Sequence, residues 1–264
     1  MSTVASEHGG DSHGDKCRYP SRGAATQMAS HHDGNESTRI CRANAAVAAS
    51  ARNWRARAMQ TIVVASRKGG SGKSMLTRHI AVEIERIGAG RVAMVDADPM
   101  QGLTGWWQAR AAGSPLLIDI AEGLPAAVAT ARRLPADVLL IDTPPSNGDI
   151  VAESVALADI VVIPVQPSPD DLRAVGSTVA LAKRLRKRLV FVVNRVKPRA
   201  RLTGQAAIVL SQHGTVCPVM VADRTVYAAS GTDGRTAPEM DPAAAAEIAG
   251  LWRYLADCMA EVAV

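Results

Sequence analysis

From residue 61 onward, short apolar runs alternate with longer stretches in which apolar residues recur at helical spacing. The runs are rich in Val, Ile and Leu and most are apolar throughout, which is typical of parallel strands covered on both faces. They predict strands over residues 61–66, 91–95, 116–120, 137–141, 160–165, 189–193 and 216–219. The stretches between them predict helices over residues 74–87, 124–133, 150–158, 170–186, 202–213 and 242–262.

Strands that alternate with helices in this way indicate an α/β fold, with three layers (α/β/α) and a mostly parallel sheet in the middle. The ligands of such sheets bind beyond the carboxyl ends of the strands. The residues that directly follow each predicted strand are therefore the first candidates for chemistry.

The first 58 residues have a different composition. They are rich in Ser, Gly, Ala, His and Arg and show no sustained period before Ala43, so we expect a disordered tail (1–58) followed by one domain (59–264). Met59 lies two residues before the first strand, which raises the alternative of an over-extended start. A targeting peptide over Arg39–Ala58 is disfavoured because it lacks an apolar segment. The four histidines of this tail lack zinc-ligand spacing, so no metal site is expected there.

A glycine-rich loop follows the first predicted strand. It reads Lys68-Gly69-Gly70-Ser71-Gly72-Lys73-Ser74. Its glycines let successive backbone N–H groups close around an anion, Lys73 suits the β and γ phosphates of a nucleotide, and the Ser74 hydroxyl suits Mg²⁺. The alternatives are a turn without function and, for Ser74, a simple helix N-cap. Arg67 stands where the standard phosphate loop has glycine.

Carboxylates and an amide follow three later strands. Asp96 and Asp98 come after the second strand, Asp142 after the fourth and Asn194 after the sixth. A carboxylate at the end of an apolar strand that follows a phosphate loop suits a Mg²⁺ ion held through water. Each of these residues is also common at plain turns or strand ends, so the prediction rests on their order along the chain.

The run K-G-G-x-G-K-[ST], formed here by Lys68–Ser74, resembles the deviant phosphate loop of the ParA/MinD superfamily, whose members are phosphate-loop NTPases. The resemblance implies ATP and Mg²⁺ as cofactors, and a homodimer in which Lys68 reaches the nucleotide of the partner subunit. It also implies that Asp98 positions the attacking water, that Asp142 faces the metal and that Asn194 reads adenine. Met100 is inserted relative to the family's D-x-D-P-Q-G pattern. The segment from Val165 to Asp170 resembles the family's segment after the fifth strand, with Asp170 as a helix N-cap, and we assign it a structural role. The implied reaction is slow ATP hydrolysis, that is, phosphoryl transfer to water.

The chain carries a net charge of +5, and its basic residues are concentrated. Nine basic residues and no acid lie between Lys183 and Arg201. Such a run is often only a solvated face, but it spans a helix end, a strand and a turn, so we expect folding to gather it into a surface for sequence-independent phosphate contacts. Similarity to ParA-type proteins implies non-specific DNA binding by the ATP-bound dimer. The candidates are Lys183, Arg184, Arg186, Lys187, Arg188, Arg199, Arg201 and Arg224.

The resemblance favours a cytoplasmic, nucleoid-associated partition ATPase that positions a plasmid, a chromosome or a protein cargo, with a ParB-type or cargo-adaptor partner that stimulates hydrolysis. A MinD-like membrane-cycling regulator is a rival. The last predicted helix has an apolar stripe on one side, and its polar side is net acidic. An acidic side does not suit an anionic bilayer, so we expect the stripe to pack in the core and not to bind a membrane. A non-hydrolysing nucleotide-binding scaffold is a further alternative. Iron–sulfur carriers are disfavoured because none of the four cysteines form a C-x-x-C pair.

Overall fold

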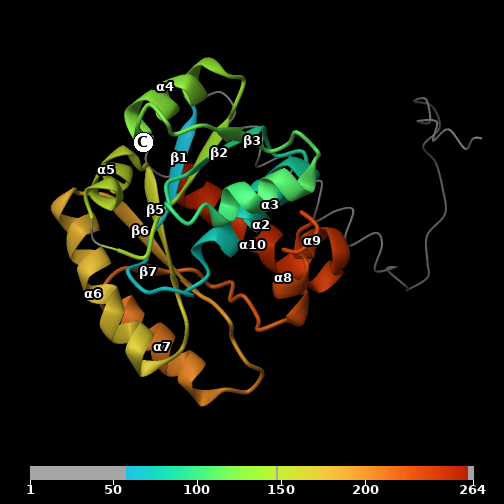
Figure 1. Ribbon diagram of the computed structural model, residues 1–264. Coiled ribbons are helices and arrows are strands. Elements are labelled where there is room, and N and C mark those ends of the chain that lie inside the picture. The colour runs from blue at the N-terminus through green and yellow to red at the C-terminus, as the bar shows by residue number, and fades with distance from the viewer. Residues whose placement is uncertain (1–57, 147, 261–264) are drawn as a thin grey trace, which may run out of the picture.

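The computed structural model describes residues 58–146 and 148–260. In these ranges, seven parallel strands form one sheet in the order β3-β2-β4-β1-β5-β6-β7 (Figure 1). The predicted α/β fold with a parallel central sheet is confirmed. The strands are β1 (Gln60–Val64), β2 (Val92–Asp96), β3 (Leu116–Ile118), β4 (Val138–Asp142), β5 (Ile160–Val165), β6 (Arg188–Val193) and β7 (Thr215–Val216).

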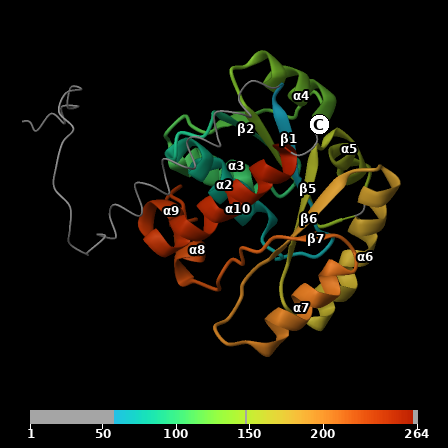
Figure 2. The same ribbon diagram turned by 180° about the vertical axis from the view of Figure 1, so that it is seen from behind.

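Helices cover both faces of the sheet, as Figures 1 and 2 show from opposite sides. One layer holds α4, α5, α6 and α7, which pack in that order, and the other holds α2, α3, α9 and α10, with α8 packed against α9. The helices are α2 (Lys73–Arg86), α3 (Gly102–Arg110), α4 (Leu124–Arg133), α5 (Asp149–Leu157), α6 (Pro169–Arg184), α7 (Arg201–Ser211), α8 (Thr225–Ala229), α9 (Ala237–Met240) and α10 (Pro242–Ala260).

The strands are apolar throughout because their alternate side chains fill two separate cores. Ile62 and Val64 of β1 point into the core beneath α2 and α10. Val63 of the same strand and Ala65, the residue after it, belong to the core beneath α4, α5, α6 and α7. Since neighbouring side chains of a strand point to opposite faces, a strand covered on both sides needs apolar residues at every position.

The last helix is part of the core. Its stripe at helical spacing, the residues Ile248, Leu251, Trp252, Leu255 and Met259, is buried against the layer that contains α2. The prediction of core packing is confirmed. None of the helices in the described part of the chain is long and apolar enough to cross a membrane.

Three local expectations differ from the structure. Helix α3 was not predicted, because Gly102 and Gly105 lower the helix propensity of a nine-residue segment that is held by burial of Leu103 and Trp106. Helices α8 and α9 were not predicted because they are only one to two turns long. The cap of α6 is Ser168 and not Asp170, since its side chain accepts a hydrogen bond from the backbone of Asp171.

Strand order places the predicted motifs at one edge. β1 lies at the centre of the sheet between β4 and β5, and β2 lies next to β4. Asp142 ends β4 in register with Val64 of β1 and Asp96 of β2. The segments that follow β1, β2, β4, β5 and β6 therefore meet at the carboxyl edge of the sheet. The expected tail and the possible start at Met59 concern residues that lie almost entirely outside the described ranges.

Candidate functional site

The glycine-rich loop joins the central strand β1 to helix α2. Gly70 (φ 74°) and Gly72 (φ 102°) adopt left-handed backbone conformations that favour glycine. Gly72 is the N-cap of α2 and offers no side chain, so the first N–H groups of the helix are left to a ligand. A helix N-terminus with free N–H groups attracts phosphate through its hydrogen bonds and its dipole. The alternative reading of Ser74 as the helix N-cap is wrong.

Lys73, the second lysine of the loop, is buried within the site. Only 6% of it is exposed, and its Nζ lies 3.5 Å from the backbone oxygen of Lys68. Burial lowers the pKa of Lys73, while the charges of Asp142 and Asp98 raise it. These opposing effects show that the loop lysine and the two predicted carboxylates share one electrostatic environment.

Asp142 is the most perturbed carboxylate of the site. It is fully buried, and neither of its oxygens accepts a hydrogen bond within ordinary geometric limits in the described part of the chain. Burial raises the pKa of Asp142 to about 7, with the Ser74 hydroxyl and Lys73 acting against that shift and Asp96 and Asp98 adding to it. A buried carboxylate that lacks a hydrogen-bond partner indicates that the site binds a further group, such as a cation.

These residues fit Mg²⁺ bound together with a nucleotide. In the described ranges no group of three or more His, Cys, Asp or Glu side chains could hold a metal ion by itself. Mg²⁺ typically takes only one or two protein ligands beside substrate phosphates and water, so the Ser74 hydroxyl and Asp142 are sufficient. The hydroxyl of Ser71 in the loop is also buried, and it has no hydrogen-bond partner among the described residues. Both orphaned groups belong to the phosphate-loop end of the site.

Asp96 and Asp98 have different environments. Asp96 is buried, and its carboxylate accepts hydrogen bonds from the backbone (2.8 Å) and hydroxyl (3.0 Å) of Thr104 and from the backbone of Asp98 (3.2 Å). It therefore holds the turn into α3, as the turn alternative proposed. Asp98 is half-buried and accepts one bond, at 3.0 Å from the backbone of Met100. Of the two acids, Asp98 keeps more capacity to bind water.

Lys68, the first lysine of the loop, pairs within its own chain. Its ammonium contacts the carboxylate of Asp171 in the first turn of α6. Lys68 is 36% exposed and Asp171 only 3%. Asp171 also accepts a hydrogen bond of 2.5 Å from the Ser168 hydroxyl. Sequence reasoning treated residues 165–170 as structural and missed Asp171, since no local pattern links it to a lysine that precedes it by more than a hundred positions.

Asn194 lies against the loop. Its side-chain nitrogen donates to the backbone oxygen of Ser71 at 2.8 Å, and it is fully buried. Gln166, which follows β5, donates in the same way to the backbone oxygen of Gly70 at 2.8 Å. Gln166 was not predicted to take part in the site. The structure thus brings Asn194 against the phosphate loop, and the contact with adenine that the resemblance implies stays a prediction.

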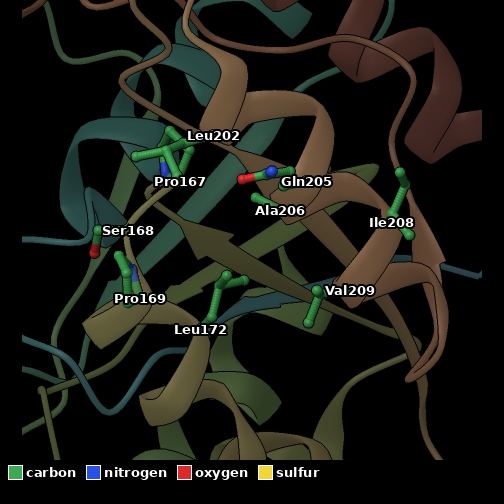
Figure 3. A pocket seen from close by; sticks show the side chains of 9 residues that line it. All are labelled: Pro167, Ser168, Pro169, Leu172, Leu202, Gln205, Ala206, Ile208 and Val209. Carbon is green, nitrogen blue, oxygen red and sulfur yellow. The ribbon is translucent and has the colours of Figure 1, made fainter.

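An apolar groove borders the Lys68–Asp171 pair. It has a cavity volume of about 420 Å³ between the start of α6 and the outer side of α7 (Figure 3). Leu202 and Ile208 of α7 are 50% and 65% exposed there. The groove is lined by Pro167, Ser168, Pro169, Leu172, Leu202, Gln205, Ala206, Ile208 and Val209.

The predicted basic surface is divided into two groups. Lys183 and Arg184 end α6, and Arg186 and Lys187 precede β6, whereas Arg199 and Arg201 follow that strand. A strand of six residues separates its ends by about 20 Å. The expectation that folding gathers the whole run is therefore wrong, because a parallel strand places its two ends at opposite edges of the sheet.

Two of the predicted DNA-binding arginines have partners inside the fold. The guanidinium of Arg188 contacts the backbone oxygen of Cys258 near the end of α10. Arg224 donates to the carboxylate of Glu247 at 2.7 Å and 3.1 Å, and Tyr227 donates to the same carboxylate at 2.8 Å. The hydrogen bond to Glu247 raises the pKa of Arg224. Both arginines contribute to the structure of the fold.

Residues 62–234 match the model of the CobQ/CobB/MinD/ParA nucleotide binding domain. The chain belongs to this family. Maintenance of carboxysome distribution protein A of Halothiobacillus neapolitanus is 29% identical over 184 residues, which cover 66% of this chain and 84% of that protein. Protein ParA of Rhizobium radiobacter is 27% identical over 186 residues, which cover 65% and 82%. The loop from Lys68 to Ser74 therefore belongs to a nucleotide-binding ATPase domain of the ParA/MinD type.

Solved structures of the family share the fold. Apo McdA of Cyanothece matches with a TM-score of 0.60 at 18% identity, over 75% of this chain and 99% of that chain. The MinC:MinD cell division protein complex of Aquifex aeolicus matches with a TM-score of 0.62 at 20% identity, over 74% and 95%. The match to almost the full length of these chains indicates that the described domain contains the whole ParA/MinD fold.

Proposed function

We propose that this chain is a slow, Mg²⁺-dependent ATPase of the partition and positioning kind, and that its ATP-bound form is a homodimer with the nucleotides between the subunits. The observation that supports the proposal most strongly is the arrangement of Lys73, Asp98 and Asp142 around one phosphate loop that begins with a second lysine, Lys68. Relatives named for partition and for carboxysome distribution support the cellular role.

The residues have distinct roles in this proposal. The N–H groups of Gly69, Gly70, Ser71 and Gly72 and the start of α2 bind the phosphates, and Lys73 neutralises the β and γ oxygens. Ser74 and Asp142 would hold Mg²⁺, a role that requires Asp142 to be ionised. When bound, Mg²⁺ neutralises charge on the transferred phosphoryl group.

Asp98 is the residue that we assign to the attacking water. Its carboxylate lies at the carboxyl edge, close enough to Lys73 to raise that lysine's pKa. With one oxygen committed to the Met100 backbone, Asp98 can accept a proton or a hydrogen bond from water through the other. The rate then comes from positioning and charge neutralisation and not from a covalent intermediate.

Lys68 is assigned to the dimer. In the single chain it contacts Asp171, and 36% of it is exposed. To reach the nucleotide of a partner subunit, Lys68 has to leave Asp171, so ATP and a second chain would compete with an internal carboxylate for the same ammonium. This competition gives a physical basis for a switch between monomer and dimer.

DNA binding and cargo form the second part of the proposal. The basic residues of either group, Lys183, Arg184, Arg186 and Lys187 or Arg199 and Arg201, suit contacts to DNA phosphates without sequence preference. Two copies in a dimer would double those contacts, which makes DNA binding depend on ATP. A ParB-type or cargo-adaptor protein would stimulate hydrolysis, and the protein would act in the cytoplasm on the nucleoid.

A MinD-like membrane-cycling role is the alternative from the same family. The structure does not favour a membrane-cycling role, because the apolar stripe of α10 packs in the core and does not face outward. The discriminating experiment measures sedimentation of the full chain with DNA and with anionic liposomes, each in the presence of ATP or ADP. We expect the chain to sediment only in the sample that contains both DNA and ATP. Sedimentation of the chain with liposomes instead would favour the alternative.

The enzymatic part is tested by phosphate release from ATP with Mg²⁺ and with EDTA. We expect slow turnover that EDTA stops and that Lys73→Ala and Ser74→Ala abolish. Asp98→Ala should retain ATP binding and lose hydrolysis. Binding of ATP without any hydrolysis in the wild type, with DNA and the partner present, would instead support the non-hydrolysing scaffold.

A further inference from the structure

Helix α3 carries the turn that contains Asp98. The backbone oxygen of Asp98 accepts a hydrogen bond from the backbone of Gln101 at 2.8 Å, and the backbone oxygen of Gln101 accepts one from Gly105 at 2.9 Å. The carboxylate of Asp96 fastens Thr104 in the first turn of the same helix. The position of α3 on the domain therefore sets the position of the Asp98 turn relative to the phosphate loop.

The sequence of α3 gives this helix little stability of its own. It has nine residues, which include Gly102 and Gly105, and its N-cap Gln101 has a left-handed backbone with a φ of 51°. A helix of this length is marginal in water without tertiary contacts, and glycine lowers helix propensity further. The place of α3 therefore depends on the contacts that the rest of the chain makes with it.

The far end of α3 is fastened to the segment that runs from α8 to α9, which we call the bridge segment (residues 227–239). The guanidinium of Arg110, the last residue of α3, donates to the backbone oxygen of Gly234 at 3.0 Å. It also donates to both carboxylate oxygens of Glu239, at 2.9 Å and 3.0 Å. Arg110 therefore ties the end of α3 to two points of the bridge segment.

The bridge segment also meets α3 through a close backbone contact. Gly234 has a φ of 73°, and a Cβ atom there would lie 2.1 Å from the backbone nitrogen and the Cα of Arg110. The indole of Trp106 donates to the backbone oxygen of Arg235 at 3.0 Å, and Trp106 is only 3% exposed. Because the two backbones touch at a glycine, a movement of one requires a movement of the other.

The other side of the bridge segment is fastened to α2. Arg78 of α2 donates to the backbone oxygen of Tyr227 at 3.1 Å. The Nε2 of His79 lies 3.3 Å from the hydroxyl of Ser230, and both residues are fully buried. Since α2 begins at the phosphate loop and α3 begins at the Asp98 turn, the bridge segment joins the two helices that carry the two halves of the site.

We propose that Arg110 is a positioning residue for hydrolysis. Through Gly234 and Glu239 it holds α3 against the bridge segment, and it thereby holds the Asp98 turn in place relative to the phosphate loop. The proposal rests on the proposed function in taking Asp98 as the residue that positions the attacking water. A helix of nine residues is about 13 Å long, so Arg110 acts from the opposite end of α3 and not by contact with the water.

Binding and hydrolysis of ATP should respond differently to the loss of Arg110. The groups assigned to the phosphates belong to the loop and to the start of α2, whereas Arg110 acts on α3. A water-positioning group that is displaced lowers the rate of the chemical step, because small departures from the reactive geometry are costly. The loss of Arg110 should therefore lower kcat and leave the affinity for Mg-ATP unchanged.

The experiment combines single-turnover ATP hydrolysis with calorimetric titration of Mg-ATP, both on the full chain. The variants are Arg110→Met, which keeps approximate length and removes the donors, and Glu239→Gln, which weakens the pair and keeps an acceptor for Thr236. Arg173→Met, from the exposed pair with Asp170 on α6, is the matched control and should behave like the wild type. We expect kcat to fall roughly tenfold to a hundredfold in Arg110→Met and less in Glu239→Gln, with the Kd for Mg-ATP within about twofold.

A second readout needs no hydrolysis. Hydrogen exchange in the nucleotide-free chain measures how firmly the Asp98 turn is held. We expect the backbone N–H groups of Gln101 and Thr104 to exchange faster in Arg110→Met, with those of α2 unchanged. A contribution of Arg110 to stability alone would instead speed exchange throughout the domain and leave kcat per bound ATP unchanged.

Other outcomes would overturn the proposal. A Kd for Mg-ATP that rises as much as kcat falls in Arg110→Met would show that Arg110 acts on binding. Unchanged kcat and unchanged exchange at the Asp98 turn would show that α3 is held without it. Where Arg110→Met does not fold, Glu239→Gln decides, since Glu239 is 26% exposed. A wild-type chain that hydrolyses no ATP would overturn the proposed function, and the exchange at the Asp98 turn would still decide whether Arg110 holds it.

Discussion

The ammonium of Lys68 contacts the carboxylate of Asp171 within the same chain. The pair joins the loop after β1 to the first turn of α6, and Asp171 is almost fully buried. Its second oxygen has no hydrogen-bond partner in the described part of the chain. Lys68 therefore supplies the counter-charge of a buried acid, and its removal has a cost in the single chain as well as in a dimer.

The first prediction concerns the stability of the nucleotide-free protein. Lys68→Ala leaves Asp171 buried without its counter-charge, and we expect the free energy of unfolding to fall by about 1–2 kcal/mol, less than for a fully buried pair because Lys68 is partly exposed. Lys68→Ala combined with Asp171→Asn should regain most of that loss. Urea denaturation measures both, with Arg173→Ala, from the exposed pair with Asp170, as the control. Equal losses in Lys68→Ala and the double variant would contradict the pairing.

The second prediction is a pH dependence set by Asp142. Its pKa is about 7 in the folded protein and near 3.8 when unfolded. The unfolded chain therefore loses this proton first as the pH rises, and the contribution of Asp142 to stability declines between about pH 4 and pH 7. Asp142→Asn cannot ionise, so its free energy of unfolding should exceed that of the wild type by at least about 1 kcal/mol at pH 8, with no such difference near pH 4.

The same titration affects the ligand with the opposite sign. Mg²⁺ requires the ionised carboxylate, so the affinity of the wild type for Mg-ATP should decline as the pH falls from 8 to 6. Asp142→Asn should bind Mg-ATP weakly and with a flatter pH profile. The two profiles, by denaturation and by calorimetry, test one group in two ways. A wild-type affinity that does not change across this range would place the metal on other residues.

The third prediction compares two glycines of the loop. Both have positive φ, but a Cβ atom at Gly72 would meet Asn194, whereas one at Gly70 would have open space within 4 Å. Gly72→Ala should abolish nucleotide binding, since the loop or Asn194 has to move. Gly70→Ala should cost only the backbone strain of a left-handed alanine, about 1–2 kcal/mol, and keep measurable binding. Equal binding of ATP by both variants would show that the contact with Asn194 is unimportant.

The fourth prediction concerns the two basic groups. Replacing Lys183, Arg184 and Arg186 by Gln should weaken ATP-dependent DNA binding and reduce its dependence on salt, by roughly one unit of the log–log slope for each DNA phosphate that the variant no longer neutralises. Arg224→Gln should act mainly on stability, by about 1 kcal/mol, because Arg224 pairs with Glu247. DNA titrations at several salt concentrations measure the first effect and urea denaturation the second. An unchanged salt slope in the triple variant would exclude this group.

Features of the fold that depend on local pattern could be predicted from the sequence. The strands and the long helices were found within a few residues because buried parallel strands are apolar throughout. Helix α3 was missed because tertiary burial of Leu103 and Trp106 overrides its two glycines. Trp107 of the same helix is half-buried, and its indole N–H donates to the backbone oxygen of Pro115 at 2.6 Å.

The position of the site could be predicted from the sequence more fully than the residues that make it up. Lys73, Ser74, Asp98 and Asp142 lie where strand ends and motif order place them. Partners that come from distant segments, such as Asp171 for Lys68, leave no local signal. The basic run shows the opposite case, because basic residues that lie close together in the sequence are separated in space by the length of β6.

The most direct test of the central proposal is the molar mass of the full chain in solution, measured by light scattering after size exclusion with ATP and with ADP. We expect a dimer with ATP and a monomer with ADP, and a monomer in both for Lys68→Ala, although that variant still binds ATP. Asp171→Asn, which frees Lys68, should dimerise at lower ATP concentration than the wild type. A Lys68→Ala variant that dimerises with ATP like the wild type would contradict the nucleotide-sandwich dimer.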